Sequence, residues 1–204
     1  MNGAELADLP TGFAAPVADR QRTFRAVLSA MARPGTVQHA AGPDFDHPAV
    51  ASPALTAVLL TLADRETAVW LSPRLARHPS LAAFARFFTG CTLVADPAAA
   101  ALLCCAAADT PALVLDALEL GSDEAPHLGA TLVVDAQGLS TGRALTLTGP
   151  GVEQPLAVRI DLPDDRVWQQ RQALEPAFPR GIELLFACGE RLLAIPRSTH
   201  LELG

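Results

Sequence analysis

Lysine is absent from this sequence of 204 residues, and all 15 of its basic residues are arginine. Chemistry that needs a lysine amine is therefore excluded for this chain alone, whether an internal aldimine with a pyridoxal-type cofactor or the ammonium group of a P-loop. The arginines are dispersed and are outnumbered by 22 acidic residues, which gives a formal net charge of -7. Because nucleic-acid-binding proteins concentrate basic charge on one face, we expect no nucleic-acid partner.

Long apolar runs are missing as well. The most apolar stretches, Leu55 to Ala63 and Ala98 to Ala108, are well short of the ~20 residues that a membrane-spanning helix needs. The first residues, MNGAELADLPTG, contain acidic side chains where a signal peptide has basic ones, and they lack its apolar segment. We therefore expect a cytoplasmic protein with no membrane partner.

The cysteines and histidines show no metal-ligand spacing. The sequence contains no CxxC pair, and no two of its histidines lie at the spacing of one helix face. Cys104 and Cys105 are adjacent, so in a strand their side chains would point to opposite faces. We interpret the cysteines as reduced thiols of the core and expect neither a metal nor a cofactor.

Helical and extended patterns alternate in the first half of the chain. An irregular arm is expected over residues 1–16, and Asp19 predicts the N-cap of a helix that Pro34-Gly35 ends. The predicted apolar face of this helix has the spacing i, i+3, i+4, i+7 and comprises Phe24, Val27, Leu28 and Met31. The run Leu102 to Ala106 fits either a helix or a buried strand, because alanine and cysteine favour neither.

Hairpins dominate the second half. The two predicted hairpins pair residues 131–135 with 144–148 and residues 182–187 with 192–195. Two further helices are predicted at residues 111–118 and 163–174. Helices that alternate with strands and are followed by hairpins predict an α/β fold with a mixed sheet covered by helices on both faces. We expect one domain over residues 1–204.

Strong catalytic motifs are scarce: GxGxxG, GxxxxGK[ST] and HExxH do not occur. His200 is the candidate for proton transfer, because it closes the segment Ile195 to His200, in which an arginine and two hydroxyl groups follow a strand. Arg33, Arg143 and Arg197 are candidate anion-binding residues, since a guanidinium group matches the geometry of phosphate or carboxylate.

Structural alternatives stay open for each of these candidates. Ordinary hydrogen bonds that tie a terminal segment to the body equally explain the polar residues before His200. Helix capping explains Arg33, and a surface position explains Arg143. Gly149-Pro150-Gly151 allows backbone NH groups to approach an anion, and it equally fits a tight turn.

Six segments of the chain carry a resemblance to one known family. In sequence order they are FRAVLSAMARPG (24–35), VLLTLAD (58–64), GATL (129–132), GRALTLTGPG (142–151), FPRGIELL (178–185) and LLAIPRSTH (192–200). From about Phe13 to the C-terminus the sequence resembles the PhnH family, which provides one component of the bacterial carbon-phosphorus lyase core complex. Glu183 and Ser198 depart slightly from the pattern, where aspartate and threonine are expected.

The resemblance implies a three-layer α/β/α sandwich, similar to the fold of pyridoxal-phosphate-dependent transferases but without that cofactor, in a homodimer. It also implies partners. The PhnH component forms the core with the G, I and J subunits. Together with the G, I and L subunits it takes part in transferring the ribose triphosphate moiety of ATP to an alkylphosphonate, which displaces adenine.

Because the nucleosidase-like step is placed on the I component, the resemblance implies a structural or accessory role for members of the PhnH family. The alternative is that their arginine and histidine side chains contribute to an anion-binding active site shared with partners, where ATP or phosphonate binds.

Overall fold

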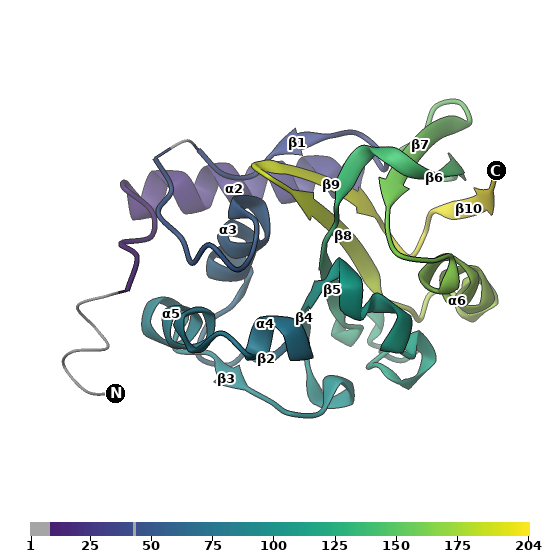
Figure 1. Cartoon of the computed structure of the whole chain (residues 1–204). Coiled ribbons are helices and arrows are strands. Elements are labelled where there is room, and N and C mark those ends of the chain that lie inside the picture. Colours follow the sequence, from purple (N-terminus) through teal and green to yellow (C-terminus); the bar gives the residue numbers. More distant parts are fainter. Residues whose placement is uncertain (1–8, 43) are drawn as a thin grey trace.

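A seven-stranded sheet of mixed direction forms the centre of the computed structural model, which describes residues 9–42 and 44–204 (Figure 1). Its strand order is β1-β9-β8-β5-β4-β2-β3, and a second sheet has the order β10-β6-β7. Residues 1–8 of the predicted N-terminal arm, and Pro43, lie outside the described residues.

The strands of both sheets are β1 (Gln38–His39), β2 (Ala68–Leu71), β3 (Thr92–Leu93), β4 (Leu102–Ala106), β5 (Thr131–Asp135), β6 (Gly138–Thr148), β7 (Leu156–Asp161), β8 (Glu183–Cys188), β9 (Arg191–Ile195) and β10 (His200–Leu203). The α-helices are α2 (Pro16–Ala32), α3 (Pro53–Leu62), α4 (Pro73–Ala76), α5 (Pro79–Thr89) and α6 (Arg166–Leu174). The 3-10 helices are η1 (Pro97–Ala99), η2 (Ala107–Ala112), η3 (Leu115–Ala117), η4 (Pro126–Leu128) and η5 (Glu175–Ala177).

The predicted mixed sheet is confirmed. Strands β3, β2, β4, β5 and β8 run parallel to one another, whereas β9 is antiparallel to β8 and β1 is antiparallel to β9. The undecided run Leu102 to Ala106 is strand β4, and all five of its residues are buried. This burial is expected for a central parallel strand, because both of its faces are covered.

Each face of the seven-stranded sheet has its own apolar core. One face packs against α2, α3 and α5, and the other packs against α6 and the three-stranded sheet. Cys104 belongs to the first core and Cys105 to the second, as predicted for adjacent residues of a strand. Burial raises the pKa of Cys105 to about 12 and raises that of Cys104 as well, so both thiols stay protonated.

The prediction for the start of the first helix is wrong. Helix α2 begins at Pro16, and Pro at the first helical position is favoured because its missing N–H has no partner there in any case. Asp19 lies inside the first turn, where its Oδ2 accepts a hydrogen bond from the Ala15 N–H at 2.9 Å. The Asp19 carboxylate therefore still accepts a hydrogen bond from a backbone N–H at the start of the helix, although Asp19 itself is a helical residue.

The predicted inner face of this helix is also wrong in part. The buried residues of α2 are Thr23, Ala26, Val27 and Ala30. Phe24 and Leu28 point outward with 44% and 51% of their surface exposed. Val27 and Met31 face the core as predicted. Because α2 otherwise packs on α3, β1 and β9 with small side chains, Phe24 and Leu28 remain on the outside.

Two further predictions need correction. Residues 131–135 and 144–148 do not form a hairpin, because β5 lies in the large sheet and β6 pairs with β7 and β10. A register shift between Gly138 and Arg143 redirects β6 soon after it leaves β5. The helix predicted at residues 111–118 is two short 3-10 helices, η2 and η3, separated by extended residues.

The remaining elements follow the sequence pattern. Strands β8 and β9 form the second predicted hairpin, and the polar helix expected at residues 163–174 is α6. Trp168 on α6 is fully buried with its ring 5.2 Å from that of Phe186. In the described part of the chain, no helix is both long and apolar enough to cross a membrane.

Candidate functional site

Three of the six family-like segments, residues 24–35, 142–151 and 192–200, meet near the end of α2. A Cβ placed on Gly151 would collide with the carbonyl oxygen of Ala32, the last residue of that helix. A Cβ on Gly149 would lie 3.0 Å from the carbonyl oxygen of Ser198. The Gly149-Pro150-Gly151 turn is therefore packed between the helix end and the segment that leads to His200. Of its two interpretations, this packing supports the tight turn.

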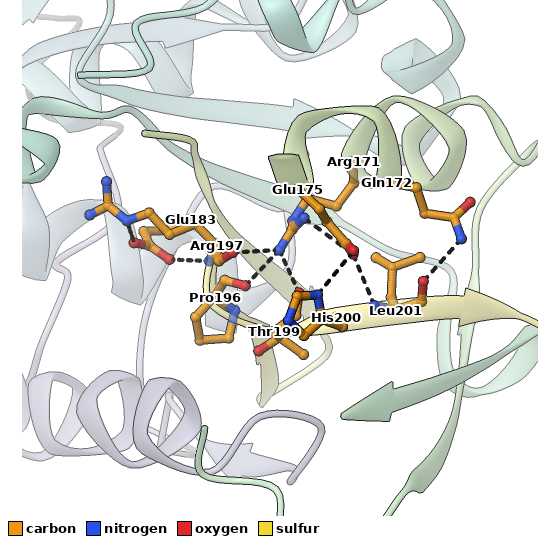
Figure 2. A network of polar contacts seen from close by, with 9 residues as sticks. All are labelled: Arg171, Gln172, Glu175, Glu183, Pro196, Arg197, Thr199, His200 and Leu201. Carbon is orange, nitrogen blue, oxygen red and sulfur yellow. Dashed lines mark hydrogen bonds and ion pairs between the residues drawn. The ribbon is translucent and has the colours of Figure 1, made fainter. Parts of the chain in front are cut away.

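Arg197 is fixed on several sides (Figure 2). Its Nε forms an ion pair with Glu183 Oε1 at 2.7 Å, and its backbone N–H donates to Glu183 Oε2 at 2.9 Å. Its Nη1 donates to the carbonyl oxygen of Pro126. Gly181 lies beneath the Arg197 side chain, where a Cβ would approach Arg197 Cβ to 3.2 Å. The predicted anion-binding guanidinium group is thus already paired with a carboxylate.

Arg171 is the centre of the network in Figure 2. It has only 2% of its surface exposed, yet it carries a full positive charge in the core. Its Nη2 donates to the carbonyl oxygens of Pro196, Arg197 and Thr199 at 3.0, 2.9 and 2.7 Å. Burial lowers the pKa of this guanidinium group, whereas Glu175 and Glu183 raise it. One buried side chain therefore holds the backbone of the closing segment, Ile195 to His200, at three of its carbonyl groups.

Glu175 extends this network to His200. Its Oε1 lies 3.6 Å from Arg171 Nη1 and accepts the Leu201 N–H at 3.0 Å. Its Oε2 lies 3.1 Å from Nδ1 of His200, whose ring is largely exposed. Gln172 Nε2 donates to the carbonyl oxygen of Leu201 at 3.0 Å. These contacts support the alternative that the segment is tied to the body by ordinary hydrogen bonds.

The other two predicted arginines lie apart from this network. Arg33 is exposed at the C-cap of α2, beside the Gly149-Pro150-Gly151 turn. Arg143 pairs with Asp165 at 3.5 Å, and both side chains are partly exposed. In the β6 and β10 ladder, His200 lies opposite Thr148, five residues further along β6 than Arg143. At ~3.4 Å per residue this is about 17 Å, so Arg143 is not part of one cluster with His200.

Sequence reasoning missed Arg171 and Glu175. They form an i, i+4 pair of opposite charge, a spacing that signals only a helix-surface ion pair and gives no hint of burial. Their role depends on the closing segment, which follows α6 by some 25 residues and folds back over it. Glu183 was noted in the sequence only as a departure from a family pattern, and the structure pairs its carboxylate with Arg197.

The part of the chain that the structure describes shows neither a nucleophile elbow nor a metal site. Gly138 to Gly142 reads GLSTG and matches the GxSxG spacing, but it lies within strand β6 and not in a turn from strand to helix. Ser140 is therefore no candidate nucleophile on this motif. In residues 9–42 and 44–204 no group of three His, Cys, Asp or Glu side chains is placed to hold a metal ion.

Comparisons with known proteins agree with these motifs. Residues 11–202 match the family model described as "Bacterial phosphonate metabolism protein (PhnH)". The chain is 37% identical over 198 residues to the alpha-D-ribose 1-methylphosphonate 5-triphosphate synthase subunit PhnH of Rhizobium meliloti (strain 1021), covering 93% of this chain and 94% of the relative. It is 36% identical over 84 residues to the putative C-P lyase subunit protein HtxG of Stutzerimonas stutzeri, covering 41% and 43%. The chain belongs to the PhnH family of bacterial phosphonate metabolism proteins.

Proposed function

We propose that this chain is a structural or accessory subunit of the carbon-phosphorus lyase assembly. With its partners it serves the transfer of the ribose triphosphate moiety of ATP to an alkylphosphonate. The observation that carries the proposal is the family match over nearly the whole chain, together with a relative of matched length that is named as a synthase subunit. The accessory role is supported by the pairing of Arg197 and His200 with carboxylates of the same chain.

The proposal includes finer points that the resemblance supplies. The chain forms a homodimer, binds the G, I and J subunits in the cytoplasm, and acts together with the L component. Its one domain has a three-layer arrangement similar to that of pyridoxal-phosphate-dependent transferases. Without lysine, the chain cannot form the internal aldimine that defines the chemistry of those enzymes.

The outer face of α2 is the best-supported partner surface. Val17, Phe24 and Leu28 are 86%, 44% and 51% exposed. Their spacing of seven and four residues places them on one line of the helix. Arg25 lies exposed beside this apolar strip. Arg22 lies further round the helix, where it forms an ion pair with Asp19 at 2.9 Å. The fitting partner is therefore a subunit with an apolar surface that presents a carboxylate to Arg25.

A double variant tests this surface. Phe24→Ser with Leu28→Ser is expected to weaken capture by co-expressed G, I and J subunits at least about tenfold, since apolar anchors at the centre of an interface carry most of its affinity. Unfolding free energy should stay within about 0.5 kcal/mol of wild type, because both side chains are exposed. The measurement is co-purification on a tagged partner, followed by affinity in solution.

Phe87→Ser is the matched control, since Phe87 is equally exposed but lies on α5. Equal capture of the double variant and of this control would remove α2 as the partner surface. Failure of the wild-type chain to associate with any of the three partners would end the subunit proposal itself.

Arg33 is the residue on which the second candidate function, a share in an anion-binding active site, can be tested. Because it is exposed beside the Gly149-Pro150-Gly151 turn, it is the predicted arginine that is best placed to contact an ATP or phosphonate bound to a partner. An accessory role predicts that Arg33→Ala leaves turnover of the reconstituted assembly within about twofold of wild type. Arg77→Ala is the control, because Arg77 is likewise an exposed helix C-cap, on α4. A tenfold loss in Arg33→Ala alone would favour a shared anion-binding site.

A further inference from the structure

The connection from β4 to β5 covers its face of the large sheet with unusually short helices. A crossover between parallel strands usually carries an α-helix, and both faces of a parallel strand are normally covered. Residues 107–130, all of which the structure describes, instead form the 3-10 helices η2, η3 and η4. Trp70 of β2 and Ala100, just before β4, lie on this face, in the core that α6 also enters. The sheet over β2 is therefore bordered by short helical turns.

Two hollows lie side by side on this face. The first, of about 440 Å³, is lined by Ala68 at the start of β2 and by Ala100. The second, of about 380 Å³, is lined by Trp70. Ala68 and Trp70 are two residues apart in one strand, so their side chains point to the same face, and Ala98 lines both hollows. Together the two hollows form one groove, which we call the β2 groove.

Exposed apolar side chains line the β2 groove. Leu128 lines the first hollow and has 60% of its surface exposed, and Val114 lines the second and has 56% exposed. The buried side chains of Leu113 and Leu118 complete the wall of the second hollow. Apolar side chains that are exposed together in a hollow mark a binding surface more often than isolated ones do.

The charged side chains of the β2 groove are all acidic. Glu66 and Glu119 line the first hollow, and Asp96 and Asp109 line the second. The chain has 15 arginines, yet among the described residues none of them lines either hollow. Within residues 9–42 and 44–204, none of the four carboxylates forms an ion pair. The groove therefore presents negative charge that no neighbouring arginine balances.

Hydrogen bonds hold the two carboxylates of the second hollow in place. Asp96 Oδ1 accepts the N–H of Ala98 at 3.0 Å, and Asp109 Oδ2 accepts the hydroxyl of Ser72 at 2.6 Å. A carboxylate has two oxygens and about four lone-pair sites, so each of these groups retains capacity to accept further hydrogen bonds from a cation.

We propose that the β2 groove binds an amphipathic helix of a partner protein whose apolar face is edged by arginine or lysine. The apolar lining receives the apolar face, as in other complexes of a helix with a groove. The four carboxylates attract basic side chains at the edges of the helix and repel acidic ones. A bound helix would also supply the cover that the β4–β5 connection lacks. The inference concerns a surface other than the outer face of α2 and does not rest on the proposed subunit role.

Titration of the full chain with a designed peptide tests the proposal. The peptide has about 18 residues, enough to form a helix, with leucines at the spacing i, i+3, i+4, i+7 and arginines beside them. We expect saturable binding with a dissociation constant of ~100 μM or tighter. The same peptide with glutamate in place of arginine should bind at least about tenfold more weakly. Tryptophan emission reports binding locally, because Trp70 lines the groove and Trp168 is fully buried.

A double variant tests the apolar part of the groove. Val114→Ser with Leu128→Ser should weaken binding of the arginine peptide at least about tenfold, because both side chains are exposed apolar contacts of the groove. Val37→Ser is the matched control, since Val37 is also exposed but lines neither hollow.

A second double variant tests the charge. Glu66→Gln with Glu119→Gln should lower the affinity for the arginine peptide about fivefold at low salt and reduce its dependence on salt. Glu190→Gln with Glu202→Gln removes the same net charge from exposed positions that line neither hollow, and it should bind as wild type does. Equal losses in the two double variants would mean that the peptide senses only the net charge of the chain, which would overturn the proposal.

Other results would overturn it as well. These are absence of saturable binding, equal affinity for the glutamate peptide, or undiminished binding by the folded variant of Val114 and Leu128. The competing occupant is a second copy of this chain, because α2 exposes an apolar strip beside Arg25. Self-association in analytical ultracentrifugation that is lost both in this variant and in Phe24→Ser with Leu28→Ser would assign the groove to that second copy.

Discussion

Arg171→Leu is expected to lower the free energy of unfolding by about 3–5 kcal/mol, the range for removing one partner of a buried ion pair. Leucine fills part of the space, but it leaves three carbonyl oxygens of the closing segment without their donor. Glu175 also loses its cation, at a site with little solvent. Urea unfolding followed by circular dichroism measures the loss as a lower midpoint at constant slope.

Arg166→Leu on the same helix is the matched control for this prediction. Arg166 is largely exposed, and its ion pair with Asp164 is a surface one, so the expected change is below about 1 kcal/mol. If both variants were equally stable, the Arg171 network would make no special contribution to the free energy of unfolding.

Gly151→Ala is expected to destabilise the protein by about 2 kcal/mol or more. Gly151 has a φ of +80°, where a residue with a Cβ is strained by about 1–2 kcal/mol. In addition, the new methyl group would collide with the backbone carbonyl of Ala32, which cannot move without unwinding the end of α2. Thermal and urea unfolding of the variant give the size of the effect.

Gly189→Ala separates the two causes. Gly189 also has a positive φ, of +56°, but a Cβ there would meet nothing within 4 Å. We therefore expect only the conformational cost, about 1 kcal/mol. Equal losses at Gly151 and Gly189 would contradict a close contact between the glycine turn and α2.

The parts of the fold that the sequence predicted well are those determined by neighbouring residues. The hairpin of β8 and β9 followed from two apolar runs around a short turn, and α6 followed from the polar segment at residues 163–174. These signals act within a few residues, so no tertiary context overrides them.

The wrong predictions concern elements whose packing or pairing depends on segments that are distant in the sequence. Phe24 and Leu28 have a helical apolar spacing. That spacing alone does not distinguish a face that packs on the core from one that is exposed. In the structure, small residues of α2 pack on the core, and Phe24 and Leu28 are exposed. The predicted pairing of residues 131–135 with 144–148 failed because β4 and β8 pair with the two edges of β5, which leaves no edge for β6. The residues near β5 in the sequence contain no signal for strands that pair with it from distant parts of the chain.

The candidate site shows the same division. Arg197 and His200 stood out as polar residues after a strand, and the structure places both in one network. Arg171, which binds the backbone of that segment, lies some 25 residues earlier in a helix whose charges are ordinary in sequence. Burial turned a common i, i+4 pair into the centre of the network, and burial of a charge depends on the whole fold.

The docking of α2 also has a consequence for how the chain folds during synthesis. Gly35, just after α2, donates its N–H to Ala194 in β9, and β1 pairs with β9 as well. The packing of this helix is therefore complete only after β9 has left the ribosome. Contacts between sequence ends are slow to form, because a long loop must close first. Before β9 is made, α3 can cover only part of the inner face of this helix, so apolar surface of α2 is exposed in the nascent chain and favours aggregation.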